Sequence, residues 1–290
     1  IGFLLLIGFI LSSGKTVYGL MERLTKTIIL LGVPFVFILT VFLSSKADWS
    51  ALVSGMVGQG SGYTFLPEGI VLATFLAAFA YAGAGGNLNL TQSIYVKEKG
   101  YGMGKYAQRI AGLFQKKDGA QEIKLEGADF EDNEQARKNF LVWWKRISIE
   151  HALVFWFIGA FSILLLMLLA YVTTFGAIDN AEGINFVINE GYAIGRMLLP
   201  GIGSAFLLVV TVMLFHAQLG VMASTSRIMA ENAAISLTKN KKGGSVPLSK
   251  IYFIFLWAQI AFGIILFLFG VTEPKALLIL GACINAVAMF

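Results

Sequence analysis

Long runs of apolar residues dominate the chain, and shorter polar segments separate them. Apolar runs cover about residues 1–12, 24–44, 66–94, 148–175, 197–220, 250–271 and 276–290. A helix needs roughly 20 residues to cross the hydrocarbon core of a bilayer, and most of these runs approach that length. Segments in lipid must satisfy their own backbone hydrogen bonds, which favours helices over strands. We therefore expect an all-α fold class, a polytopic membrane helical bundle forming a single transmembrane domain over 1–290.

The composition agrees with a membrane location. Hydrophobic residues make up 57% of the chain and charged residues 13%, about half the charged share of a soluble domain. The net charge of +5 comes from basic residues between the apolar runs, so it indicates topology rather than nucleic-acid binding. A single cysteine, Cys283, excludes a disulfide framework. Both ends lie within apolar runs, so we expect a fragment that is cut within a span at each end.

The distribution of lysine and arginine predicts sidedness. Segments 13–23, 95–147 and 236–250 are basic, whereas 45–65 holds only Lys46 and 176–195 holds no basic residue. Basic loops face the cytoplasm, so the first three segments are predicted to be cytoplasmic and the other two external. Within the domain, 97–147 is expected to form one large cytoplasmic loop.

A glycine-rich stretch interrupts the third apolar run. The sequence "AYAGAGGNLNLTQS" places three glycines before a series of amide and hydroxyl side chains. Non-helical backbone at membrane depth is tolerated only where it lines a cavity, and its free carbonyls bind cations. We predict two half-helices joined by a break within 82–88; close helix packing through small residues is the alternative. The candidate substrate-binding or ion-binding residues are Ala82, Gly83, Gly85, Gly86, Asn87, Asn89, Gln92 and Asn285, with Gly83, Gly86 and Asn87 supplying metal-binding oxygens.

Three ionisable residues form a candidate proton pathway. Glu150 and His151 open the fourth apolar run, either solvated at the inner interface or acting as a proton-handling pair. His216 lies near the end of the fifth run. It is a functional candidate because ionisable groups inside membranes are costly, or it is a neutral histidine hydrogen-bonded to a neighbouring helix.

The order of these features resembles the Nramp family of divalent-metal transporters, which have the LeuT-type fold. The segment "YGLMERLTKTIILLGVPFVFILTVFLSSKADW" resembles the fifth span of that family, and the interrupted stretch resembles its sixth. Similarly, "RISIEHALVFWFIGAFSILLLMLLA" resembles the seventh span and "SAFLLVVTVMLFHAQLGVMASTSRIMAE" the eighth. The resemblance runs from about the fourth span to the tenth and implies a bundle with a discontinuous helix.

The resemblance implies a secondary active transporter of divalent cations of the Mg, Mn and Fe class, working by alternating access, with proton coupling as a further expectation. The Met-Pro-His motif of the family's sixth span would fall near Gly85, Gly86 and Asn87, where none of its residues is present. A site without the thioether offers oxygen ligands, which suit harder ions such as magnesium. The missing first span of the family would supply the main carboxylate.

The expected partners are thus a divalent metal ion, as substrate, and the lipid bilayer, with no cofactor. One alternative is a LeuT-fold transporter of an amino acid or organic cation, since a half-helix amino end suits a carboxylate. Another is a membrane-embedded enzyme, which would need a cluster of catalytic groups. The two histidines lie on different runs with the one cysteine near neither, so we expect no enzyme activity.

Overall fold

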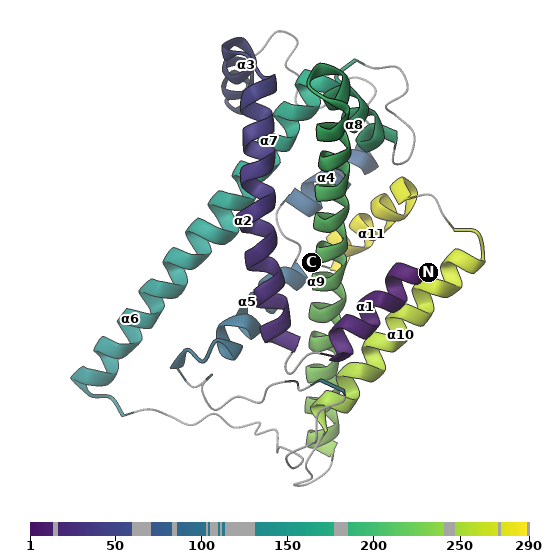
Figure 1. Cartoon of the computed structure of the whole chain (residues 1–290). Coiled ribbons are helices and arrows are strands. Elements are labelled where there is room, and N and C mark those ends of the chain that lie inside the picture. The colour runs from purple at the N-terminus through teal and green to yellow at the C-terminus, as the bar shows by residue number, and fades with distance from the viewer. Residues whose placement is uncertain are drawn as a thin grey trace. The chain divides into compact units, whose positions relative to one another are not determined.

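Figure 1 shows the computed structural model of the chain. The structure describes residues 1–13, 17–59, 71–82, 86–102, 104, 110, 112–113, 131–176, 185–240, 247–271 and 274–288. For 79–82, 86–89, 238–240, 274–275 and 285–288 it describes the backbone alone.

The described residues are helical and include no strand, so the all-α fold class is confirmed. In the first half of the chain the helices are α1 (Gly2–Ser13), α2 (Val17–Leu43), α3 (Lys46–Met56), α4 (Leu72–Ala82) and α5 (Gly86–Glu98). In the second half they are α6 (Glu134–Glu150), α7 (Ile158–Thr173), α8 (Asn185–Met197), α9 (Pro200–Asn240), α10 (Leu248–Leu268) and α11 (Pro274–Ala288). A π-helix, η2 (His151–Phe157), joins α6 to α7.

Four of the described helical stretches are long and apolar enough to cross a membrane. They are Val17–Leu43, Glu134–Thr173, Pro200–Leu237 and Leu248–Leu268. Large apolar side chains remain exposed along them, among them Leu30, Trp156 and Phe262. Exposed apolar surface on helices of this length is what lipid contact requires, and the chain is therefore consistent with an integral membrane protein.

Helices also occupy three segments that were predicted to be loops. Within 45–65, α3 begins at a capping box in which Ser45 and Asp48 accept hydrogen bonds from each other's backbone N–H. The backbone N–H and the hydroxyl of Ser45 both donate to the Asp48 carboxylate and hold the pKa of Asp48 below its usual value. The segment 176–195 contains most of α8, and α6 fills the end of 97–147, which is therefore not loop throughout. Polar N-caps start two of these helices, Ser45 at α3 and Asn133 at α6, where hydropathy alone gives no signal.

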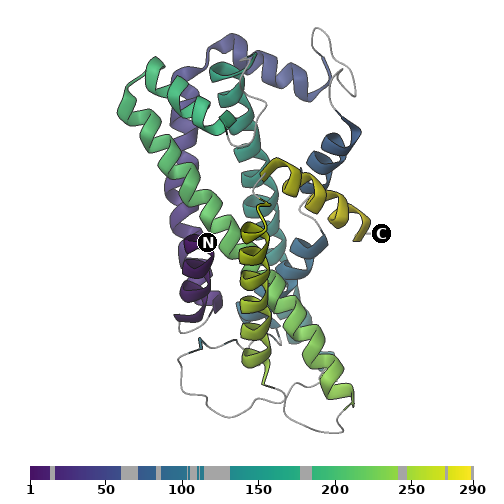
Figure 2. The same ribbon diagram turned by 90° about the vertical axis from the view of Figure 1, so that its right-hand side faces the viewer.

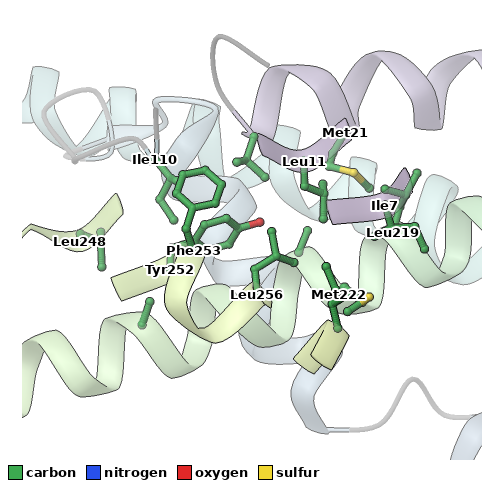
Figure 3. Packing of buried hydrophobic residues seen from close by; sticks show 14 of the residues in the cluster. Ile7, Leu11, Met21, Ile110, Leu219, Met222, Leu248, Tyr252, Phe253 and Leu256 are labelled. Atoms are coloured by element: carbon green, nitrogen blue, oxygen red, sulfur yellow. The ribbon is translucent and has the colours of Figure 1, made fainter. Parts of the chain in front are cut away.

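By its internal contacts the chain divides into two units. Unit 1 comprises Ile1–Lys26, Gly86–His151 and Phe215–Thr272. Its core joins α1, the start of α2, the end of α9 and α10 around Leu11, Leu219 and Tyr252, as Figure 3 shows. On α1, a Cβ added to Gly8 would lie 2.6 Å from Ile260 Cδ1, so a larger residue there would require side chains of α10 to shift.

Unit 2 comprises Thr27–Gly85, Ala152–Leu214 and Glu273–Phe290. One cluster in it joins Leu39 of α2, Leu169 of α7, Ile194 of α8 and Phe206 of α9, all buried. Elsewhere in the unit, α11 packs across α4, which Figure 2 shows in yellow against blue.

Candidate functional site

The predicted helix break falls where the structure describes the flanking helices only. Ala82 ends α4 and Gly86 begins α5, whereas Gly83 and Gly85 lie outside the described residues. Two helices in place of one are consistent with two half-helices, but the non-helical link itself stays a prediction. Among the other candidates, Asn87 and Asn89 lie in the first turn of α5 and Gln92 is half-buried further along it. Asn285 lies on α11.

The three candidates for a proton pathway have separate surroundings. The Nε2 atom of His216 lies 2.9 Å from the Thr25 hydroxyl on α2, within hydrogen-bonding distance. Glu150 forms an ion pair with Lys99 of the segment after α5, and its side chain is 38% exposed. His151 is exposed at the start of η2. No described contact links these groups into a pathway, and the pathway remains a prediction.

A chain of alternating charges connects α5 with α9 inside unit 1. Arg227 forms ion pairs with Glu98 and, over 2.8 Å from its Nε, with Glu231 Oε1. The Lys97 ammonium lies 3.1 Å from the same Glu231 oxygen. We call Lys97, Glu231, Arg227 and Glu98 the ion-pair chain. Its members carry two positive and two negative charges, so the group is neutral as a whole.

The centre of the ion-pair chain is buried. The side chains of Arg227 and Glu98 are 7% and 4% exposed, whereas that of Lys97 is 39% exposed. Breaking a buried pair by removing one partner costs about 3–5 kcal/mol, because a charge is left in a poorly solvated place. Residues 227 and 231 are one turn apart on α9, so a single helix face presents both charges to the end of α5.

A cavity lies beside the ion-pair chain. It has about 350 Å³ of empty space including its open mouth, and its walls come from α2, α5, α9, α10 and Ile110. The hydroxyls of Tyr18 and Tyr252 are buried and have no hydrogen-bond partner among the described residues. Both tyrosines line the cavity, together with Thr91, Ser224, Glu98 and Arg227. Figure 3 shows the Tyr252 hydroxyl pointing into the core cluster. The lining is mainly apolar, and these unpartnered hydroxyls and the charged groups of the ion-pair chain are its polar points.

Sequence reasoning missed the ion-pair chain. Its signal was the pair Arg227 and Glu231 at helical spacing, directly after an apolar run in "ASTSRIMAEN". Intramembrane charges are functional candidates by default, and the same rule drew attention to His216 a few turns earlier. The partner Glu98, 129 positions away, was assigned to a solvated loop and had no individual signal.

Among the described residues, no group of three or more His, Cys, Asp and Glu side chains is arranged to hold a metal ion. The ion-binding candidates rely on backbone and amide oxygens, which such a group does not include. Comparison with known proteins adds no assignment: no family model, no curated protein and no solved structure matches the chain.

Proposed function

We propose that the protein is a secondary active membrane transporter of divalent cations that works by alternating access. The observation that carries the proposal is the ion-pair chain, which is buried beside a cavity and joins the short helix α5 to the long apolar helix α9. Charged groups in membrane helices are costly and mark pathways for ions and substrates. In transporters, discontinuous helices with free backbone carbonyls form such sites near the bilayer midplane.

The residues at the start of α5 support a cation as the substrate. In the sequence, α5 begins with Gly86, Asn87 and Asn89, whose carbonyl or amide oxygens we propose as ligands, and Gly83 precedes it. Oxygen ligands without a thioether favour hard ions, so magnesium is the preferred substrate in this proposal and manganese the next. The resemblance of the run order to the Nramp family supports the same class of substrate.

Uptake into proteoliposomes tests the proposal. Vesicles that contain the full chain and are loaded with a magnesium-sensitive dye should take up magnesium faster than vesicles without protein. Asn87→Ala should reduce this uptake by about tenfold or more. Ser93→Ala is the matched control: Ser93 lies on the same helix, is exposed, and donates to the Leu90 carbonyl over 2.6 Å.

The outcome for each class of substrate is distinct. Uptake of a labelled amino acid or organic cation with no magnesium signal would show that the substrate is organic and not a metal ion. Equal magnesium uptake by the wild-type protein, Asn87→Ala and Ser93→Ala would show that the Asn87 amide does not bind the ion. No uptake of either kind in sealed, correctly loaded vesicles would contradict transport.

A further inference from the structure

Unit 2 contains a buried carboxyl group for which the described residues provide no counter-charge. Glu190 lies in the middle of α8, is 6% exposed, and its Oε1 atom has no hydrogen-bond partner among the described residues. Acidic side chains are almost never buried to this degree unless they are paired. The sequence assigned Glu190 to an external loop, where it was one of three acidic residues.

Close backbone packing fixes the position of α8. A Cβ on Gly203 of α9 would lie 2.2 Å from the Gly191 carbonyl oxygen, and a Cβ on Gly191 would lie 2.6 Å from Leu207 Cγ. One turn after Glu190, Ile194 is fully buried against α2, α7 and α9. The helix therefore holds the Glu190 side chain in the interior and leaves it little room to reach solvent.

The helices packed around α8 offer no charge to compensate a carboxylate. The parts of α2, α7 and α9 in unit 2, which are 27–43, 158–173 and 200–214, contain no Asp, Glu, Lys, Arg or His. Tyr171 of α7 is 45% exposed and Tyr192 of α8 is 64% exposed. Arg196 is exposed at the end of α8. On α3, Lys46 is exposed and Asp48 is engaged in the helix cap.

An ion in such a place is unstable, whereas the neutral acid is not. Isolated charges that lose water either gain a partner or lose their charge by taking up a proton. We propose that Glu190 is a proton-binding site. The bound proton keeps α8 packed against α7 and α9, and its release weakens that packing. The site differs from the ion-pair chain and its cavity, and it does not depend on the identity of any transported substrate.

Electrostatics support the geometry. Burial raises the pKa of Glu190 from 4.5 to about 7. A carboxyl whose pKa is raised by folding is protonated in the folded state at acidic pH, where its burial costs least. As pH rises from about 4.5 towards 7, the folded state must keep a proton that the unfolded state has lost, and stability falls. Above about 7 the full penalty is present.

Two measurements on the full chain test the proposal. Infrared spectroscopy should show the carbonyl band of a protonated carboxyl at about pH 6 that fades by about pH 8, as the titration of one site requires. Glu190→Gln should abolish that band. Asp48→Asn is the matched control in the same unit and should leave the band, because a lowered pKa keeps Asp48 ionised throughout.

The second measurement follows the packing of α8 against its neighbouring helices. With Cys283 replaced by serine, Ile194→Cys probes a fully buried position and Tyr192→Cys an exposed one on the same helix. The ratio of maleimide labelling at position 194 to that at position 192 should rise about tenfold from about pH 6 to about pH 8, if release of one proton loosens the packing of α8. The added Glu190→Gln change should make that ratio independent of pH.

Either measurement can overturn the proposal. A carboxyl band that is missing at about pH 6 in the wild-type protein would mean that Glu190 is ionised and held by a bound cation. A labelling ratio with the same pH dependence in the wild-type and Glu190→Gln backgrounds would mean that another group controls α8.

Discussion

Removal of Arg227 should show what the ion-pair chain contributes to stability. Arg227→Met keeps the apolar stem and deletes the guanidinium that pairs with Glu98 and Glu231. Glu98 is 4% exposed and would lose its ion pair in a poorly solvated place, whereas Glu231 would keep Lys97 at 3.1 Å. The expected loss is about 3–5 kcal/mol, the cost of breaking a buried pair from one side.

The partner substitution should cost less. Glu98→Gln removes a negative charge and leaves Arg227 its 2.8 Å ion pair with Glu231. We expect a loss of about 1–2 kcal/mol, since an ion pair becomes a hydrogen bond from the guanidinium to a neutral amide. The double variant should be more stable than Arg227→Met alone, because no uncompensated carboxylate then remains at 98. The coupling free energy between the two sites should be about 2 kcal/mol.

Thermal unfolding in detergent, followed by circular dichroism, measures these differences. A loss of about 3–5 kcal/mol corresponds to a fall in Tm of about 5–8 °C for a chain of this size. Arg196→Met, at an exposed position on α8, is the control and should change Tm by no more than about 2 °C. Strict additivity of Arg227→Met and Glu98→Gln would refute the reasoning, because it would show that the two charges do not interact.

Three further predictions concern other parts of the chain. Gly203→Ala should destabilise the protein by about 1–3 kcal/mol in the same melting assay, because its Cβ would overlap the Gly191 carbonyl, while Gly201→Ala has open space and should be neutral. In intact cells, an impermeant thiol reagent should label Ser50→Cys and should not label Glu131→Cys; the reverse pattern would invert the predicted topology. In competition uptake, Gly86→Met should shift preference from magnesium towards manganese, whereas Gly86→Leu should not. Equal loss of both ions in both Gly86 variants would make that position a packing site.

Hydropathy predicted the helices that consist of one uninterrupted apolar run. The runs 24–44 and 250–271 correspond to α2 and α10, which differ from them by a few residues at the ends. In these segments nearly every residue is apolar, so no long-range information is needed. The run at 197–220 instead gave only the first half of α9, which continues to Asn240.

The second half of α9 was missed because charge compensation is not visible along the chain. Arg227 and Glu231 ended the apolar run, and hydropathy treats each charge as isolated. In the structure their charges meet those of Lys97 and Glu98 from a helix more than 120 positions earlier. Glu190 gave the opposite error, because an acidic residue indicated a solvated loop where the structure has a helix with Glu190 on its buried face.

The contacts of α5 bear on how it would move during the transport that we propose. Its sequence, "GNLNLTQSIYVKE", has few apolar residues, and Ile94 is one of the few that are buried. The end of the helix is held by ion pairs, for which desolvation offsets much of the Coulomb attraction. Such contacts can exchange partners or hydrate with a smaller net change in free energy than a packed apolar face, which loses its whole burial energy on separation. A short helix held in this way, next to glycines that permit unusual backbone angles, is suited to alternate between two positions. If so, the double variant Arg227→Met with Glu98→Gln should regain stability relative to Arg227→Met and still transport more slowly than the wild-type protein, because its uncharged contact no longer exchanges.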